Sequence, residues 1–156
     1  MNTVPPVEIR EAQPDDAAEL ARLSRALAVH VADPDPGDDT SLIVAACFGT
    51  ERWLDVLVAE QGGVILGLAA YGRRFELHTR QKTLWLADLV VDEGIRGLGV
   101  GGLLLHAVKR RALDLGCGAI VADLWGSNIA ARVFYDHAGA RKVSDIEIRV
   151  IDLPSV

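Results

Sequence analysis

The sequence predicts a mixed α/β domain. Short apolar runs typical of strands alternate along the chain with apolar residues at helical spacing, and glycines or prolines separate most of these segments. The length of 156 residues suits one domain that is large enough to bury a core. The sequence contains no internal repeat and no linker-like stretch, so we expect residues 1–156 to form a single domain.

The first third of the chain predicts one strand and two helices. Residues 7–10 form a short β-rich run, and a helix begins near Pro14, where acidic side chains suit the positive end of a helix. Apolar residues then recur at helical spacing: Ala17, Leu20, Leu23 and Leu27. Residues 33–39 hold two prolines, a glycine and four aspartates, which predicts a loop before a second helix over residues 40–47.

The middle of the chain predicts a hairpin and a further strand. Residues 56–60 and 64–71 are β-rich runs, and the Gln-Gly-Gly sequence at 61–63 is typical of a hairpin turn. Residues 72–82 are polar and have no clear periodicity, so we assign them no element. Residues 84–91, Leu-Trp-Leu-Ala-Asp-Leu-Val-Val, predict the next strand.

The last third of the chain predicts two helices and two strands. A helix over residues 103–115 is closed by Gly116, a residue type that commonly follows a helix end. Residues 119–125 predict a strand, and a helix over residues 128–138 follows it. Residues 146–151 alternate apolar and charged side chains, which predicts a final strand.

The most informative stretch is Arg-Gly-Leu-Gly-Val-Gly-Gly at residues 96–102, between the predicted strand 84–91 and the helix after it. A strand, a glycine-rich turn and a helix start leave several backbone N–H groups without an internal partner. Glycine lets an anion approach the main chain, the helix N-terminus adds partial positive charge, and Arg96 adds a full charge. The segment therefore predicts a phosphate or pyrophosphate site.

Two other interpretations of this turn can be weighed. An ordinary connection would not need four glycines in six residues, because glycine lowers helix stability. Gly97, Gly99 and Gly102 satisfy the dinucleotide pattern G-x-G-x-x-G, and Asp123 follows about twenty residues later. However, five residues separate the strand from the first glycine, where a dinucleotide fold turns at once. The absence of G-K-[ST] from the turn excludes a nucleotide P-loop.

An ordered set of residues around this turn resembles the GNAT superfamily of N-acetyltransferases. In that pattern a strand ends in valine, an arginine follows, and R-x-x-G-x-G opens a long helix closed by Gly-Cys. A later helix starts at Asn and carries Ala and Phe-Tyr before a glycine. The matching residues are Val91, Arg96, Gly99, Gly101, Gly116, Cys117, Asn128, Ala131, Phe134, Tyr135 and Gly139. The resemblance covers most of the chain.

The resemblance implies a GNAT-like acyl-CoA N-acyltransferase fold, with a mixed, mostly antiparallel central sheet flanked by helices. It implies that acetyl moves from the co-substrate acetyl-CoA to a primary amine by direct attack. Main-chain groups of the strand would bind the pantetheine arm, and the turn would hold the pyrophosphate. The implied cofactor-binding residues are Leu89, Val90, Val91, Arg96, Gly97, Leu98, Gly99, Val100, Gly101 and Asn128, the last of which could also cap its helix.

Tyr135 and Asp88 are the candidate catalytic residues. The resemblance implies that Tyr135 is the general acid, because a thiolate that leaves a thioester needs a proton and a phenol can supply it. Residues 84–96 and 53–60 also resemble the diamine and polyamine acetyltransferases, which favours a small cationic amine. Those enzymes carry Glu-Asp where this chain has Ala87 and Asp88, so the identity of the general base stays open. Asp88 would bind the substrate cation or satisfy backbone groups.

Composition bears on several other function classes. The formal net charge of −6 argues against nucleic-acid or anionic-membrane binding and suits a cationic substrate. No apolar run reaches the roughly 18 residues of a membrane span, and the N-terminus has no signal-peptide pattern. Cys47 and Cys117 form no CxxC pair, so we expect a cytoplasmic protein. The four histidines lack metal-ligand spacing, and we expect no metal.

Three other roles are compatible with the sequence: a non-catalytic acyl-CoA-binding sensor, a protein N-acetyltransferase, or a dinucleotide-dependent oxidoreductase. The sequence does not identify the amine, because the first two helices and residues 72–82, which would form its pocket, carry no motif. The alternating run 146–151 would lie at a sheet edge that must be covered, or be exchanged with a second copy. The resembled polyamine enzymes are dimers, so we expect a homodimer.

Overall fold

The structure is a computed structural model that describes residues 4–154. Its chain divides into two compact units, an N-terminal unit (Met1–Trp125) and a C-terminal unit (Gly126–Val156), and each is described by itself. The sheet and the helices α1 to α3 belong to the first unit, and α4 belongs to the second. The glycine-rich turn therefore lies in the N-terminal unit and Tyr135 in the C-terminal unit.

The described strands form one five-stranded sheet in the order β1-β2-β3-β4-β5. The strands are β1 (Glu8–Glu11), β2 (Asp55–Gln61), β3 (Val64–Glu76), β4 (Gln81–Val91) and β5 (Ala119–Ala122). All neighbours are antiparallel except β4 and β5, which run parallel and are joined by a helical crossover. This confirms the predicted mixed, mostly antiparallel sheet, although β5 is shorter than the predicted strand 119–125.

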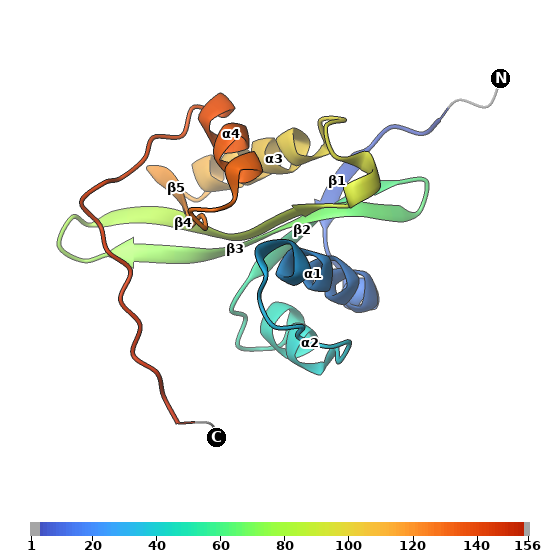
Figure 1. Ribbon diagram of the computed structural model, residues 1–156, viewed down its shortest axis with the longest axis horizontal. Helices are drawn as coiled ribbons and strands as arrows, with labels where there is room; N and C mark the ends of the chain where they lie inside the picture. The colour runs from blue at the N-terminus through green and yellow to red at the C-terminus, as the bar shows by residue number, and fades with distance from the viewer. Residues whose placement is uncertain (1–3, 155–156) are drawn as a thin grey trace. The chain divides into compact units, whose positions relative to one another are not determined.

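Helices cover both faces of the sheet in the N-terminal unit (Figure 1). After the short 3-10 helix η1 (Pro14–Asp16), α1 (Ala17–Val31) and α2 (Ser41–Phe48) pack on one face, and α3 (Val100–Asp114) packs on the other. The core under α1 and α2 is built from Leu20, Leu23, Cys47, Val56, Val58, Ile65, Leu68, Ala70 and Val90. Alternate strand residues thus face each helical layer, as the apolar pattern predicts.

Gly67 of β3 lets α3 and the end of β4 approach each other closely. A Cβ at this position would lie 2.7 Å from the carbonyl oxygen of Val90 and 3.3 Å from the Cδ1 atom of Leu104. Leu104 and Val108 of α3 are fully buried. The start of α3 is therefore held against the strand end that precedes the glycine-rich turn.

The hairpin between β3 and β4 extends through the residues 72–82 to which the sequence pattern assigns no element. β3 continues to Glu76 and β4 begins at Gln81, so most of this polar stretch is strand. Near the hairpin tip neither face is covered, and side chains such as Phe75 and Leu77 are exposed. The pairing is therefore carried by backbone hydrogen bonds without an apolar alternation that sequence analysis could detect.

The C-terminal unit contains α4 (Ile129–His137), preceded by Asn128 as N-cap and followed by Gly139 with a positive φ of 83°. The predicted final strand over residues 146–151 is wrong. None of the described residues 126–154 is in a strand, and residues 146–151 are exposed. Alternation makes a segment competent to be a strand, but a strand also needs a partner for its backbone groups, and the described part of this unit offers none.

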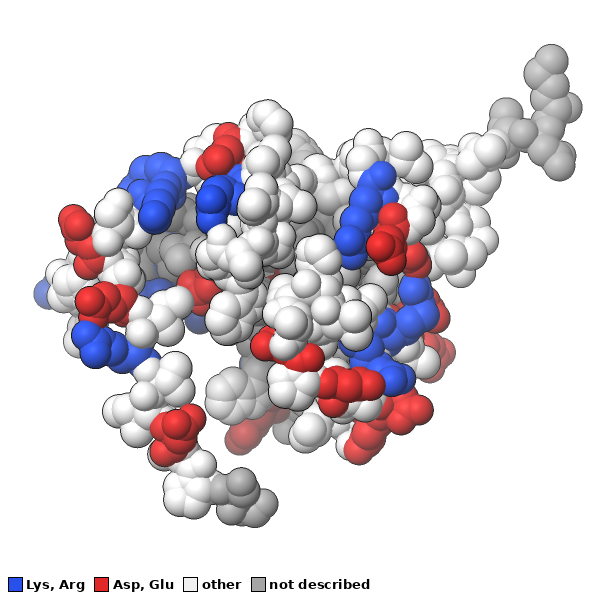
Figure 2. All heavy atoms as spheres, viewed as in Figure 1, with Lys and Arg blue, Asp and Glu red and all other residues white. Residues whose placement is uncertain are grey.

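Charged side chains of both signs are interspersed on the face that Figure 2 shows, without a large area of one sign among the residues drawn in colour. Across residues 4–154, no three His, Cys, Asp or Glu side chains are grouped so that they could hold a metal ion. Within the same residues, every helix is too short or too polar to cross a membrane.

Candidate functional site

The end of β4 leaves one of its edges open. β4 pairs with β5 only from Thr83 to Leu86, whose partner is Ala122. Beyond that point no described strand pairs with the β5 side of residues 87–91. An open strand edge presents backbone N–H and C=O groups that an extended, amide-bearing molecule can pair with. The predicted cofactor-binding residues 89–91 lie on this edge.

A β-bulge in β4 sets the orientation of Asp88. Ala70 of β3 pairs with Asp88, whereas the next residue, Tyr71, pairs with Leu86, so Ala87 is the extra residue of the bulge. Directly opposed residues of two strands share a face of the sheet, and Ala70 belongs to the core under α1 and α2. Asp88 therefore points to the α1/α2 face, where it is half-buried.

Burial raises the pKa of the Asp88 carboxyl above its ordinary value, because loss of water disfavours the carboxylate. Among the described residues, no hydrogen bond or charged partner offsets this effect. Burial also raises the pKa of the Cys47 thiol in α2, and the charge of Asp88 adds to that shift. An ammonium group beside Asp88 would favour the carboxylate and supply the missing partner.

The turn after β4 presents backbone N–H groups. After the 3-10 helix η2 (Glu93–Ile95), Gly97 and Gly99 have φ values of 83° and 87°, a conformation that favours glycine. A Cβ at either position would meet nothing within 4 Å, so the main chain is open to approach. Helix α3 begins at Val100, earlier than the predicted residue 103, and its first N–H groups have no carbonyl partner within the helix. The geometry suits an anion.

Hydrogen bonds fix the turn to the sheet and to α1. The Nε atom of Arg96 donates to the carbonyl oxygen of Val91 at 3.2 Å. The backbone N–H of Asp92 donates to the carbonyl oxygen of Leu66 at 2.8 Å. The Asp92 carboxylate accepts a hydrogen bond from Arg22 Nη1, also at 2.8 Å. The turn is thus positioned by β3, β4 and α1 together.

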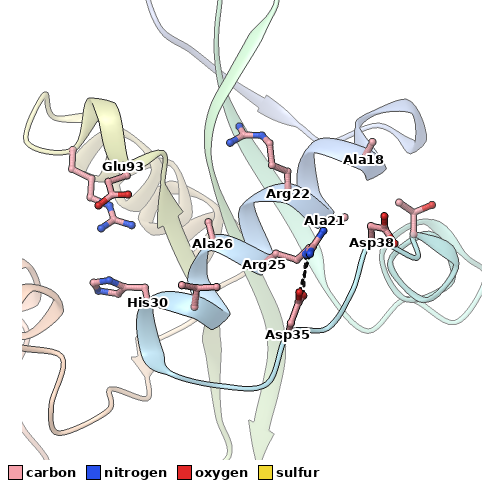
Figure 3. Close-up of a pocket in the computed structure, with 12 residues that line it drawn as sticks. Ala18, Ala21, Arg22, Arg25, Ala26, His30, Asp35, Asp38 and Glu93 are labelled. Carbon is pink, nitrogen blue, oxygen red and sulfur yellow. Dashed lines mark hydrogen bonds and ion pairs between the residues drawn. The ribbon is translucent and has the colours of Figure 1, made fainter.

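A pocket of about 630 Å³ adjoins the turn on its α1 side (Figure 3). It is lined by α1, by the acidic loop that follows α1, and by Glu93 and Arg96 of the turn. His30 and Glu93 both line it, and Arg25 Nη2 binds the Asp35 carboxylate at 2.8 Å. Arg96 therefore belongs to both the pocket and the anion-binding turn.

The C-terminal unit holds the other predicted site residues. The Oδ1 atom of Asn128 accepts a hydrogen bond at 3.0 Å from the backbone N–H three residues later, which confirms its predicted role as helix cap. Tyr135 packs edge-on against Phe134, with ring centroids 5.2 Å apart. The structure brings Asp88 and residues 89–101 together within the N-terminal unit, and Asn128 and Tyr135 within the C-terminal unit.

Sequence reasoning missed the contact between Trp85 and Asp123. The indole Nε1–H of Trp85 donates to the Asp123 carboxylate at 3.2 Å. In the dinucleotide interpretation Asp123 would bind a ribose, but the structure shows it serving its neighbour across the β4–β5 pair. No local pattern could reveal this contact, because it depends on the parallel register of two strands that are far apart in the sequence.

A sequence model of the Acetyltransferase (GNAT) family matches residues 20–140. The matched region includes the open edge of β4, the glycine-rich turn and α4. The chain therefore belongs to the GNAT acetyltransferases. It is an N-acetyltransferase, and acetyl-CoA is the co-substrate of this family. Family membership decides against the dinucleotide interpretation of the turn.

Individual proteins show how far the similarity extends. Thialysine N-epsilon-acetyltransferase of Bos taurus is 29% identical over 151 residues, which cover 90% of this chain and 88% of that protein. The structure of an integron cassette protein from the V. cholerae mobile metagenome has a TM-score of 0.80 at 21% identity, covering 94% of this chain and 92% of its own. Ribosomal-protein-alanine N-acetyltransferase of Brucella melitensis has a TM-score of 0.76 at 19% identity, covering 96% and 100%. These two structures support the fold.

Proposed function

We propose that this protein transfers acetyl from acetyl-CoA to a primary amine of a small cationic molecule. The observation that carries the proposal is the open edge of β4, which leads into the glycine-rich turn and has Asp88 at its start. The name of the Bos taurus relative, thialysine N-epsilon-acetyltransferase, supports an amine on a small molecule as the acceptor. The protein's net charge of −6 suits a cation.

The cofactor would lie along the β4 edge and end at the turn. Residues 89–91 would pair their backbone groups with the amides of the pantetheine arm, as an added strand does. Pyrophosphate oxygens would accept hydrogen bonds from N–H groups of residues 97–101, and the guanidinium of Arg96 would balance their charge. The open space beside Gly97 and Gly99 fits this use, since a side chain there would occupy the approach. Asn128 stays a proposed cofactor contact in addition to its capping role.

The reaction would proceed by direct attack. The amine nitrogen forms a bond to the thioester carbonyl carbon, the carbon–sulfur bond breaks, and the sulfur takes a proton from the Tyr135 hydroxyl. The proton lost by the amine passes to Asp88 or to water. Because both substrates are held together, part of the entropy cost is met by binding, and no protein nucleophile is required.

A thiol-release assay with acetyl-CoA and a panel of amines tests the function. The panel should contain aliphatic diamines, neutral-tailed monoamines, amino acids, aminoglycosides and peptides. We expect the release of CoA to be fastest with a small cationic amine. Fastest release with a peptide N-terminus would show a protein N-acetyltransferase, and CoA binding without release with any amine would show an acyl-CoA sensor.

Asp88 should control the acid side of the pH profile. Since burial raises its pKa, we expect kcat/KM to fall with decreasing pH at a higher pH than for an ordinary aspartate, as the carboxylate is protonated. In Asp88→Asn this limb should vanish, and kcat/KM at neutral pH should be roughly 10- to 100-fold lower. The pH–rate profiles of the two proteins check this. An unchanged acid limb in Asp88→Asn would contradict the role.

Asp88→Asn also has an expected effect on stability. Folding raises the pKa of this carboxyl, so its contribution to the free energy of unfolding is largest below the pKa that it has in the unfolded chain. That contribution is lost as the pH rises through the pKa of the folded protein. At neutral pH the buried carboxylate is therefore unfavourable. The asparagine variant should unfold at the same or higher denaturant concentration, so a loss of activity would not reflect loss of structure.

We also propose that the chain forms one functional domain and a homodimer. The family match runs across the boundary between the two compact units, which supports a single domain. The C-terminal segment carries a row of exposed apolar side chains that a second copy could cover: Ile146, Ile148, Val150, Ile151 and Leu153.

Light scattering at micromolar concentration checks the dimer. We expect a mass near twice the chain mass of 16.7 kDa. Replacing Ile148 and Val150 by lysine should shift the mass toward that of one chain, because two charged side chains would interrupt the exposed apolar row. A mass near 16.7 kDa for the unaltered protein would overturn the proposal.

A further inference from the structure

Trp85 lies exposed on the α1/α2 face of the sheet, close to Asp88. Its cross-strand partner in β3 is Gly72, and a Cβ on Gly72 would lie 3.9 Å from the Trp85 ring atom Cε3. The ring therefore lies beside the glycine, which it shares with the Trp53 carbonyl oxygen and the Leu54 Cδ2 atom, 3.4 and 3.7 Å from the same Cβ position. The relative solvent exposure of Trp85 is 39%. Single exposed aromatic side chains are common on protein surfaces, so any role of this ring depends on what holds it and on what lies beside it.

The indole is held in place by a carboxylate. Its Nε1–H donates to the Asp123 carboxylate of the neighbouring β5 end at 3.2 Å. This hydrogen bond to an anion fixes the plane of the ring and increases the electron density on its face. Both effects favour a cation on the exposed face, because such a cation is attracted by the negative face of the ring.

The distance from Trp85 to Asp88 is set by the register. Trp85 pairs with Gly72 and Asp88 with Ala70, so the two side chains lie two residues of β3 apart on one face, about 7 Å along the strand. The bulge at Ala87 makes this possible, since without it residues 85 and 88 would point to opposite faces. An indole face and a half-buried carboxylate are thereby placed side by side.

We propose that Trp85, held by Asp123, is the residue that selects a second positive charge on the acceptor. The acceptor is then an aliphatic dication whose reacting nitrogen lies at Asp88 and whose distal ammonium lies on the face of the Trp85 ring. This inference rests on the proposed function. It adds a specificity-determining pair that neither the glycine-rich turn nor the family pattern contains.

The alternative occupants fit this surface less well. An anionic tail would meet the Asp123 carboxylate and the negative face of the indole. A neutral alkyl tail would gain the apolar contact with the ring but none of the electrostatic attraction. The arrangement therefore discriminates by charge at the distal end of the acceptor, and the discrimination is lost if either the ring or its carboxylate is removed.

Calorimetric titration with tetramethylated putrescine tests the proposal. This dication has tertiary nitrogens that stay protonated at neutral pH and form no stable amide. We expect Trp85→Leu to weaken its binding roughly three- to thirty-fold. Trp85→Phe should retain part of the affinity because it keeps an aromatic face. Asp123→Asn should also weaken binding, since the hydrogen bond to an anion is lost.

Phe75→Leu is the matched control, because Phe75 is another exposed aromatic residue of the same hairpin on the opposite face. The Phe75→Leu variant should bind the dication with the same affinity as the unaltered protein. Equal affinity in Trp85→Leu, or an equal loss in Phe75→Leu, would overturn the proposal. Circular dichroism of each variant confirms that the fold is intact.

Acetyl transfer to propylamine and to putrescine separates this proposal from the proposed function. Trp85→Leu should raise KM for putrescine and leave KM for propylamine nearly unchanged. If the unaltered protein acetylates neither amine, the proposed small-amine function fails while the titration still decides the role of Trp85. If it acetylates both and Trp85→Leu affects them equally, the inference about Trp85 fails alone.

Discussion

Replacing Tyr135 by phenylalanine is expected to lower kcat about 10²- to 10⁴-fold. The variant keeps the ring that packs edge-on against Phe134 and removes only the hydroxyl group. Without that proton donor the sulfur must leave as a free thiolate or take its proton from water. Affinity for CoA should change little, because the hydroxyl is proposed to act in the reaction and not in holding the cofactor. Steady-state kinetics with the best amine and calorimetry with CoA check both expectations.

Tyr71→Phe is the matched control, since Tyr71 is the other tyrosine of the chain. Its side chain is 1% exposed in the core, where burial raises the pKa of its hydroxyl. Removing this hydroxyl should alter stability and leave kcat unchanged for folded protein. If Tyr135→Phe turns over the best amine as fast as the unaltered protein, Tyr135 is not the general acid. If both variants lose activity equally, the loss reflects structure and not proton transfer.

The parts of the fold that sequence analysis predicted well are those whose signals are local. The turn between β2 and β3 needs positive φ at Gly62 and Gly63, and glycine is the residue type that tolerates a positive φ. Helix α1 shows its buried face through the spacing of Leu20 and Leu23. The turn after β4 is similar, because its glycines, its arginine and the helix start are contiguous in the chain. Local chemistry is enough to predict such elements.

The parts that were missed depend on backbone pairing that the side-chain pattern does not reveal. Residues 72–82 form the tip of a hairpin that is exposed on both faces, so their side chains carry no alternation. Residues 146–151 do alternate, but no described strand of their unit pairs with them. The bulge in β4 shows the same limit for the site. Only the register of β3 against β4 reveals that Ala87 is the extra residue and that Asp88 shares a face with Trp85.

The bulge also bears on the open question of the general base. The residue that departs from the resembled Glu-Asp pattern, Ala87, is the one that the bulge inserts. A bulge changes the direction of the side chains around it. Asp88 therefore does not point in the direction that a glutamate at position 87 would have, and it cannot take that carboxylate's place. Asp88 points to the α1/α2 face. We therefore keep Asp88 as the proposed base, and the rise that burial causes in its pKa would suit the acceptance of a proton.

Replacing Gly99 by valine is expected to weaken CoA binding roughly 10- to 100-fold, the loss expected when one or two hydrogen bonds to a charged group are broken. Gly99 has a φ of 87° and is the N-cap of α3, where a Cβ would point into open space. A branched side chain would fill the approach to the N–H groups and also strain the backbone. Calorimetry with CoA measures the effect, and the rise in melting temperature caused by CoA should shrink with it.

Gly116→Val separates the loss of the phosphate site from backbone strain. Gly116 follows the other end of α3 and has a φ of 69°, and a Cβ at this position would likewise meet nothing within 4 Å. Both variants should therefore lose stability through an unfavourable backbone conformation, but only Gly99→Val should lose affinity for CoA. The separation works because the two ends of one helix carry opposite partial charges, and only the N-terminal end attracts an anion. Equal CoA affinity in the two variants would mean that the cofactor's phosphates are held somewhere other than the turn at residues 96–101.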